Sequence, residues 1–279
     1  MAGTGYGIVA GYDGSAGGGD ALRWAAREAW ARHTVLTVLL ASDLAAPGEP
    51  ALADLIGLAR RRGEHTVIRG LQYAESVVGP ARIRAEVTGE PPARVLCERS
   101  SAAEMVVLGS HGHGRLPGLL LGSVPWQVAV HGHGRIVVVR GSWRPVNQSP
   151  GPVVVGVDGS AASAGAIAFA FEEAALRNVH LVATCALADS AGRLGEMRRM
   201  EEQFGQEMDR QEKQHPDITV IREVVAGPPR SVLLSAAREA QMIVVGSRGR
   251  GGLDGMSLGS VAQALLHHSS CPVGVVHPD

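Results

Sequence analysis

The stretch MVVLGSHGHGRLPGLLLGSV at residues 105–124 returns as MIVVGSRGRGGLDGMSLGSV at residues 242–261. A second pair lies upstream, where YGIVAGYDGS at residues 6–15 is matched by VVVGVDGS at residues 153–160. The upstream pair is offset by 145 positions and the glycine-rich pair by 137, so the first copy carries eight extra residues in its middle. The chain is therefore two copies of one domain in tandem.

Length and composition agree with two domains. The chain has 279 residues, of which 45% are hydrophobic, enough for two buried cores. Between the copies, GSWRPVNQSPGP at residues 141–152 is rich in Pro, Gly and Ser, which is typical of a linker. We expect a first domain at residues 1–141, a linker at 142–152 and a second domain at 153–279.

Each copy alternates short aliphatic runs with longer helical stretches, which predicts βαβ units around a buried parallel sheet. The fold class is α/β, with five parallel strands and four flanking helices expected in each domain. The strands are expected near 6–12, 35–42, 81–88, 104–109 and 136–140, and near 153–158, 179–186, 218–225, 242–246 and 273–277. The second helical region, 51–79 or 190–214, is the least regular, and Ser160 or Ser163 would cap the first helix of the second copy.

The charges exclude some classes of partner. Lys and Arg number 26 and Asp and Glu 27, so no global field favours nucleic acid or an anionic membrane. No stretch reaches the roughly 20 apolar residues that span a bilayer, and three separated cysteines indicate buried reduced thiols, so we expect a cytoplasmic protein.

The glycine-rich loop after the fourth strand has the same spacing in both copies. Two residues separate the first two glycines, nine separate the second from the third, and a serine follows: Gly109, Gly112, Gly122 and Ser123, then Gly246, Gly249, Gly259 and Ser260. A glycine loop that leads into a helix exposes backbone N–H groups to an anion, and the helix terminus adds positive partial charge. Phosphate is the expected guest, although the glycines could serve only to form tight turns. Each serine could cap the helix or contact a phosphate oxygen.

An acidic residue closes the first strand of each copy, Asp13 in YDGS and Asp158 in VDGS. Ligands of open parallel sheets bind beyond the carboxyl ends of the strands, so Asp and glycine loop meet if strands one and four are neighbours. The carboxylate could then bind ribose or adenine. Its alternative role is to stabilise the turn that follows.

The strand-one Asp, the G-x2-G-x9-G-S loop and the final strand, present twice, resemble tandem universal stress proteins of the ATP-binding type. The resemblance implies ATP, with Mg²⁺, in each domain. It implies ribose or adenine contacts from Asp13 and Asp158, backbone contacts to adenine from Ala41 and Ala186, and ribose and phosphate contacts from the loop glycines and serines. It also implies a homodimer and a role in stress or dormancy responses through an unidentified protein partner.

One departure from the resemblance concerns the helix that follows each glycine loop. Many relatives have a further hydroxyl two positions after the Gly-Ser pair, where this chain has Pro125 and Ala262. Neither loop has a Walker lysine or a recognisable catalytic set, so we expect a nucleotide-dependent binding or signalling protein and not an enzyme. Two alternatives remain: a slow ATPase or adenylate-handling enzyme, and a scaffold with degenerate nucleotide sites.

The two loops differ in charge. The offset of 137 aligns His111 with Arg248 and His113 with Arg250. Arginine is always charged, whereas imidazole gains a proton only in mild acid, so the second site should bind ATP more tightly at neutral pH and the first should improve as pH falls. The alternative is that these side chains point into solvent and do not affect binding. The histidines lack an accompanying carboxylate or thiol set, so no protein-bound metal is expected.

Overall fold

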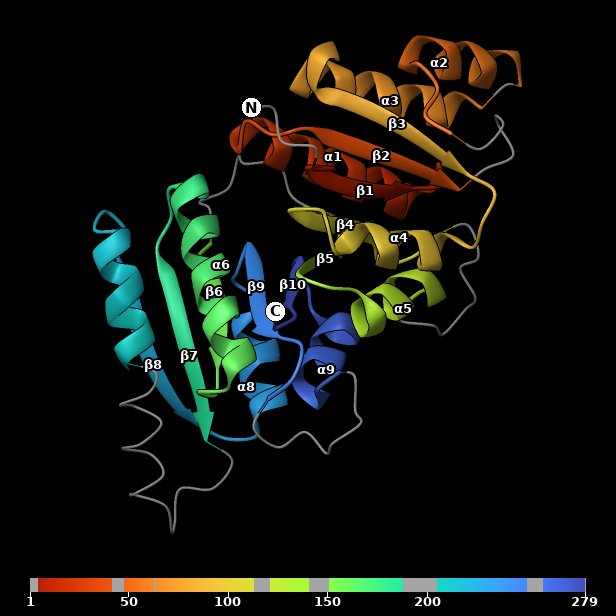
Figure 1. The fold of residues 1–279 in the computed structure, drawn as a ribbon. Helices are drawn as coiled ribbons and strands as arrows, with labels where there is room; N and C mark the ends of the chain where they lie inside the picture. The colour runs from red at the N-terminus through yellow and green to blue at the C-terminus, as the bar shows by residue number, and fades with distance from the viewer. Residues whose placement is uncertain are drawn as a thin grey trace. The chain divides into compact units, whose positions relative to one another are not determined.

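The computed structural model describes residues 5–41, 48–62, 64–112, 121–140, 151–187, 205–249 and 258–278, and the chain divides into two units, Met1–Arg140 and Gly141–Asp279 (Figure 1). The expected linker, residues 142–152, lies mostly outside the described residues, because only 151 and 152 are described. Among the described residues, no helix is long and apolar enough to cross a membrane.

The first unit is a five-stranded parallel sheet in the order β3-β2-β1-β4-β5. Its strands are β1 (Ile8–Tyr12), β2 (Leu36–Ala41), β3 (Ile83–Thr88), β4 (Met105–Gly109) and β5 (Arg135–Val139). Its helices are α1 (Ala16–Ala31), α2 (Leu52–Arg61), α3 (His65–Val78), the 3₁₀ turn η1 (Pro80–Arg82), α4 (Pro92–Ser100) and α5 (Ser123–His131). The expected fold class is confirmed here.

The second unit repeats this order as β8-β7-β6-β9-β10, again parallel. Its strands are β6 (Val153–Val157), β7 (Leu181–Leu187), β8 (Val220–Ala226), β9 (Met242–Gly246) and β10 (Val273–Val276). Its helices are α6 (Ala161–Arg177), α8 (Pro229–Ala236) and α9 (Ser260–His268), with a further helix at 205–214. All ten expected strands are present to within about two residues at either end.

Helices lie on both faces of each sheet, which explains why the inner strands are nearly continuous apolar runs. The edge strand β8 is the exception, because most of its residues are exposed. Alternate residues of β1 show the two layers, because the Gly11 position faces Leu96 of α4 whereas the Tyr12 hydroxyl reaches α3 and donates to the Thr66 carbonyl at 2.8 Å. In the second unit the Gly156 position of β6 faces Leu233 of α8 in the same way.

One expected element is different. Residues 51–79 form two helices, α2 and α3, in place of one, so the described residues of the first unit contain five α-helices and not four. Each buries its own apolar stripe, Leu55 and Ala59 in α2 and Val67 to Val78 in α3. The sequence places Gly63 between them, and glycine is among the residues least compatible with a helix interior. In the other copy, 188–204 lie outside the described residues.

No disulfide joins the three cysteines, and they are not equally buried. Cys185 and Cys271 are buried, whereas Cys97 is half-buried. The expectation of a buried thiol is therefore wrong for Cys97, which lies on α4 and packs only partly against the core cluster below it.

Candidate functional site

The strand order places the site. In each unit the chain runs from the central strand to one edge and then returns to the other side of that strand, so β1 neighbours β4 and β6 neighbours β9. A crevice at the carboxyl ends of such a pair of strands is the usual ligand site of an open parallel sheet. The predicted Asp and glycine loop meet there in both units.

The turn after β6 fixes the Asp158 side chain. Gly159 has φ +72°, which a residue with a Cβ rarely adopts, and the chain reverses sharply towards α6. The Asp158 Oδ1 atom accepts the backbone N–H of Ser160 at 3.0 Å, and the Ser160 hydroxyl accepts the N–H of Ser163 as the N-cap of α6. The first unit forms the same turn with Asp13, Gly14 and Ser15. The turn-stabilising role considered for these aspartates is therefore real, and it leaves Oδ2 on the side of the glycine loop.

The glycine loop packs directly against this turn. A Cβ added at Gly249 would collide with Asp158 Oδ2, so only glycine lets the loop approach the carboxylate. The Ser160 hydroxyl also donates to the Arg248 carbonyl at 3.4 Å. The first unit has the same contacts, with Gly112 against Asp13 and the Ser15 hydroxyl 3.5 Å from the His111 carbonyl.

The helix after the loop begins without a side-chain cap from any described residue. The N-cap of α9 is Gly259, with φ −69° and ψ 152°, and no described side chain caps the helix. The N-cap of α5 is Gly122, likewise without a side-chain cap. Ser123 and Ser260 are therefore the first helical residues and not caps, and both are exposed. The first N–H groups of a helix have no partner within it, so this end attracts anions.

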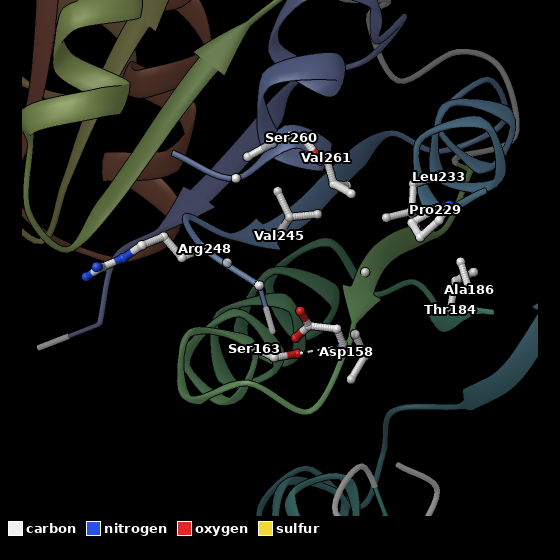
Figure 2. Close-up of a pocket in the computed structure, with 16 residues that line it drawn as sticks. Asp158, Ser163, Thr184, Ala186, Pro229, Leu233, Val245, Arg248, Ser260 and Val261 are labelled. Carbon is white, nitrogen blue, oxygen red and sulfur yellow. Dashed lines mark hydrogen bonds between the residues drawn. The ribbon is translucent and has the colours of Figure 1, made fainter. Parts of the chain in front are cut away.

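In the second unit these parts enclose a cavity of about 300 Å³ (Figure 2). The residues predicted for this site all line it: Asp158, Ala186, Gly246, Gly249, Gly259 and Ser260. Their contact with a nucleotide remains a prediction. In the view of Figure 2, Thr184 and Ala186 lie on one side with Pro229 and Leu233, Asp158 lies between, and Arg248 extends away on the other side. One side is thus apolar, and the other holds the loop and the start of α9.

The first unit brings together most of its predicted residues. Gly112 packs against Asp13, Gly109 approaches the backbone of Gly17, and the Gly122 N–H donates to the Ser110 carbonyl at 2.8 Å. Ser123 starts α5 and Ala41 ends β2, where it pairs with Thr88. Residues 113–120, which complete the loop, lie outside the described residues.

The loops differ in charge at two aligned pairs of positions, and the structure describes one of them, His111 and Arg248. Arg248 is exposed and lines the second cavity. His111 is half-buried, and its Nδ1 lies 3.0 Å from the Ser110 hydroxyl. His113 and Arg250 lie outside the described residues. The predicted difference in pH response stays a prediction.

Sequence reasoning missed several cavity residues. Gly156 and Thr184 lie two positions before Asp158 and Ala186, so strand periodicity alone could have found them. Pro229 and Leu233 come from α8, which no motif marks. Their position depends on how α8 packs on the sheet, and the sequence carries no local signal for it.

The comparisons with known proteins agree with this architecture. The model of the universal stress protein family matches residues 7–140 and again residues 151–277. A universal stress protein of Mycolicibacterium smegmatis is 35% identical over 288 residues, spanning 99% of this chain and 98% of that protein. One of Mycobacterium tuberculosis is 35% identical over 287 residues, spanning 96% of this chain and 95% of the relative.

A solved structure shares the fold over the same length. The crystal structure of a universal stress protein from Archaeoglobus fulgidus has a TM-score of 0.69 and 22% identity, and the match covers 99% of this chain and 100% of that one. The sequence motifs and the fold of both domains are therefore similar to those of universal stress proteins.

Proposed function

This chain belongs to the universal stress protein family, and from that premise we propose that each of its domains binds ATP with its Mg²⁺ and that occupancy controls the protein's stability and contacts. The observation that carries the proposal is the second cavity, where six predicted residues from four separate segments line one space of about 300 Å³. That volume is at the lower end of the range of ligand pockets.

The two ends of the cavity suit the two ends of a nucleotide. Ala186, Pro229 and Leu233 offer an apolar surface for a base. Gly249, Gly259 and the first N–H groups of α9 offer backbone donors for phosphate oxygens. Magnesium would arrive with the triphosphate and keep most of its ligands from phosphate and water.

The same cavity favours holding ATP over hydrolysing it. Of the described residues that line it, only Asp158 and Arg248 carry ionisable side chains. Asp158 is committed to the turn through the Ser160 N–H, and Arg248 extends away from it (Figure 2). Efficient hydrolysis needs a group that positions water in line with the terminal phosphate. A bound nucleotide at one hundred times its Kd would instead stabilise the fold by about 2.7 kcal/mol, which is enough to act as a signal to a partner protein or a second copy.

One observation favours the alternative of a degenerate site. Ala262 lines the cavity and is 1% exposed, at the position where many relatives are expected to have a hydroxyl. A missing phosphate contact would weaken ATP binding. Under this alternative, ATP at millimolar concentration gives no thermal shift.

The test uses a charge placed at the start of α9. A Cβ at Gly259 would meet the Ser247 carbonyl at 3.4 Å, an ordinary contact, and the backbone there suits any residue. Gly259→Glu should therefore fold and repel the phosphates, whereas Gly259→Gln has the same size without the charge. One carboxylate about 5 Å from a phosphate group is enough for at least a ten-fold loss of affinity.

Calorimetric titration of the full chain with Mg-ATP should give two sites in the wild type and one in Gly259→Glu, with Gly259→Gln close to the wild type. Gly122→Glu is the matched change in the first domain. Mass spectrometry of ligand released from the native protein should find intact ATP, and phosphate release should be far slower than one turnover per minute. Absence of binding in the wild type, or release of many phosphates per minute, would refute the proposal.

A further inference from the structure

A buried hydroxyl without a partner lies in the wall of the second cavity. Thr184 of β7 is 1% exposed, and its Oγ1 has no hydrogen-bond partner among the described residues. Thr184 lines the cavity together with Gly156, with which it is paired in register. Paired residues of neighbouring strands face the same side of a sheet, so the Thr184 side chain lies on the face that α8 covers, beside Leu233.

A hydroxyl in this position is unfavourable for the protein alone. Buried polar groups nearly always find a partner, and one left without a partner lowers stability. Valine would have the same shape and no such cost. An exception in a native protein therefore needs an explanation, such as a functional role or a bound water or ion that completes the bonding.

The first domain provides an internal comparison. The residue paired with Gly11, at the position equivalent to Thr184, is Leu39. Leu39 is 1% exposed and belongs to an apolar cluster with Leu96 and Leu108. The same position is therefore wholly apolar in one domain and carries a hydroxyl in the other.

We propose that the Thr184 hydroxyl hydrogen-bonds the edge of the nucleotide's base, which gives the second domain a base-recognition contact that the first domain lacks. This inference rests on the proposed function, because it requires a nucleotide in the cavity. Thr184 lies on the apolar side, away from Arg248 and the loop, where the base and not the phosphates would be held (Figure 2). A hydroxyl both donates and accepts, so it can match either a ring nitrogen or an amino group of a purine.

The experiment isolates the second site in the full chain with Gly122→Glu and compares Thr184, Thr184→Val and Thr184→Ser in that background. Thr184→Val keeps the shape and removes the hydroxyl, whereas Thr184→Ser keeps the hydroxyl and removes a methyl group. Mg-ATP is titrated calorimetrically, and the melting temperature of each nucleotide-free variant is measured.

We expect Thr184→Val to bind Mg-ATP about ten-fold more weakly, with an unchanged or higher melting temperature because no hydrogen bond of the free protein is lost. Thr184→Ser should stay within about three-fold of the parent. Equal affinities for Thr184→Val and its parent would overturn the inference and leave ATP binding intact, and so would a loss shared equally by Thr184→Ser. If the parent with Gly122→Glu binds no ATP at all, the proposed function of this site fails and the inference falls with it.

Discussion

Two of the loop glycines in the second domain should respond differently to replacement by alanine, in the variants Gly249→Ala and Gly259→Ala. The spacing motif treats them alike, but the structure does not. A Cβ at Gly249 would collide with Asp158 Oδ2, whereas a Cβ at Gly259 would have only ordinary contacts of 3.4 Å and longer. Neither position has a positive φ, so the comparison concerns packing and not backbone strain.

The magnitude follows from what must move. To admit the methyl group of Gly249→Ala, either the loop shifts away or the Asp158 carboxylate rotates and gives up the Ser160 N–H at 3.0 Å. A hydrogen bond to a charged group contributes about 1.5–3 kcal/mol, and overpacking costs about 1–3 kcal/mol. We expect Gly249→Ala to lower the unfolding free energy by about 1–3 kcal/mol and the ATP affinity of the second site by about ten- to one-hundred-fold. Gly259→Ala should change stability by less than about 1 kcal/mol, because a poorer N-cap offsets a less flexible unfolded chain.

The assay is Mg-ATP titration in the Gly122→Glu background, paired with urea unfolding of the nucleotide-free proteins. Gly112→Ala with Gly259→Glu provides the same comparison in the first domain, where the collision is with Asp13 Oδ2. Wild-type affinity in Gly249→Ala, or equal damage from Gly259→Ala, would refute the steric account of the loop.

Three further predictions concern charge and protonation. Burial, and after it the charge of the neighbouring Asp13, raises the pKa of Tyr12 from 10.0 to about 12. The neutral Tyr12 hydroxyl therefore stabilises the fold below pH 10, and this stabilisation is lost as pH rises to 12. Over that range the unfolding free energy of the wild type should fall by about 2 kcal/mol more than that of Tyr12→Phe. Arg248→His should make the ATP affinity of the second site rise as pH falls from 8 to 6, because imidazole gains a proton in this range, and an unchanged pH profile would show that this side chain does not reach the phosphates. Burial raises the pKa of Cys271 to about 11, so iodoacetamide at pH 8 should modify the half-buried Cys97 first in the folded protein, and faster labelling of Cys271 in peptide mapping would contradict its burial.

Much of the fold could be predicted because its signals are local. Strands covered on both faces must be apolar along their length, so β1 and β6 stand out as IVAGY and VVVGV. Because each pattern occurs in both copies, the repeat predicts the same strands in both domains. The break between α2 and α3 was missed because both segments have helical periodicity, although Gly63 marks the junction in the sequence.

By itself the sequence determined that two α/β domains follow one another and that each has an Asp and a glycine loop at the carboxyl edge of its sheet. Those features depend on the period of side chains along strands and on the short turns that follow them, which neighbouring residues decide.

Only the tertiary structure decided what surrounds these motifs. Strand pairing brings Thr184 beside Gly156, and helix packing brings Leu233 over both, although these residues are far apart in the chain. The same pairing puts Leu39 at the equivalent place in the first domain. Which glycine of the loop touches the Asp carboxylate, and whether a cavity wall carries a hydroxyl, are properties of contacts across the sheet. Such contacts follow from the packed fold and leave no pattern along the chain.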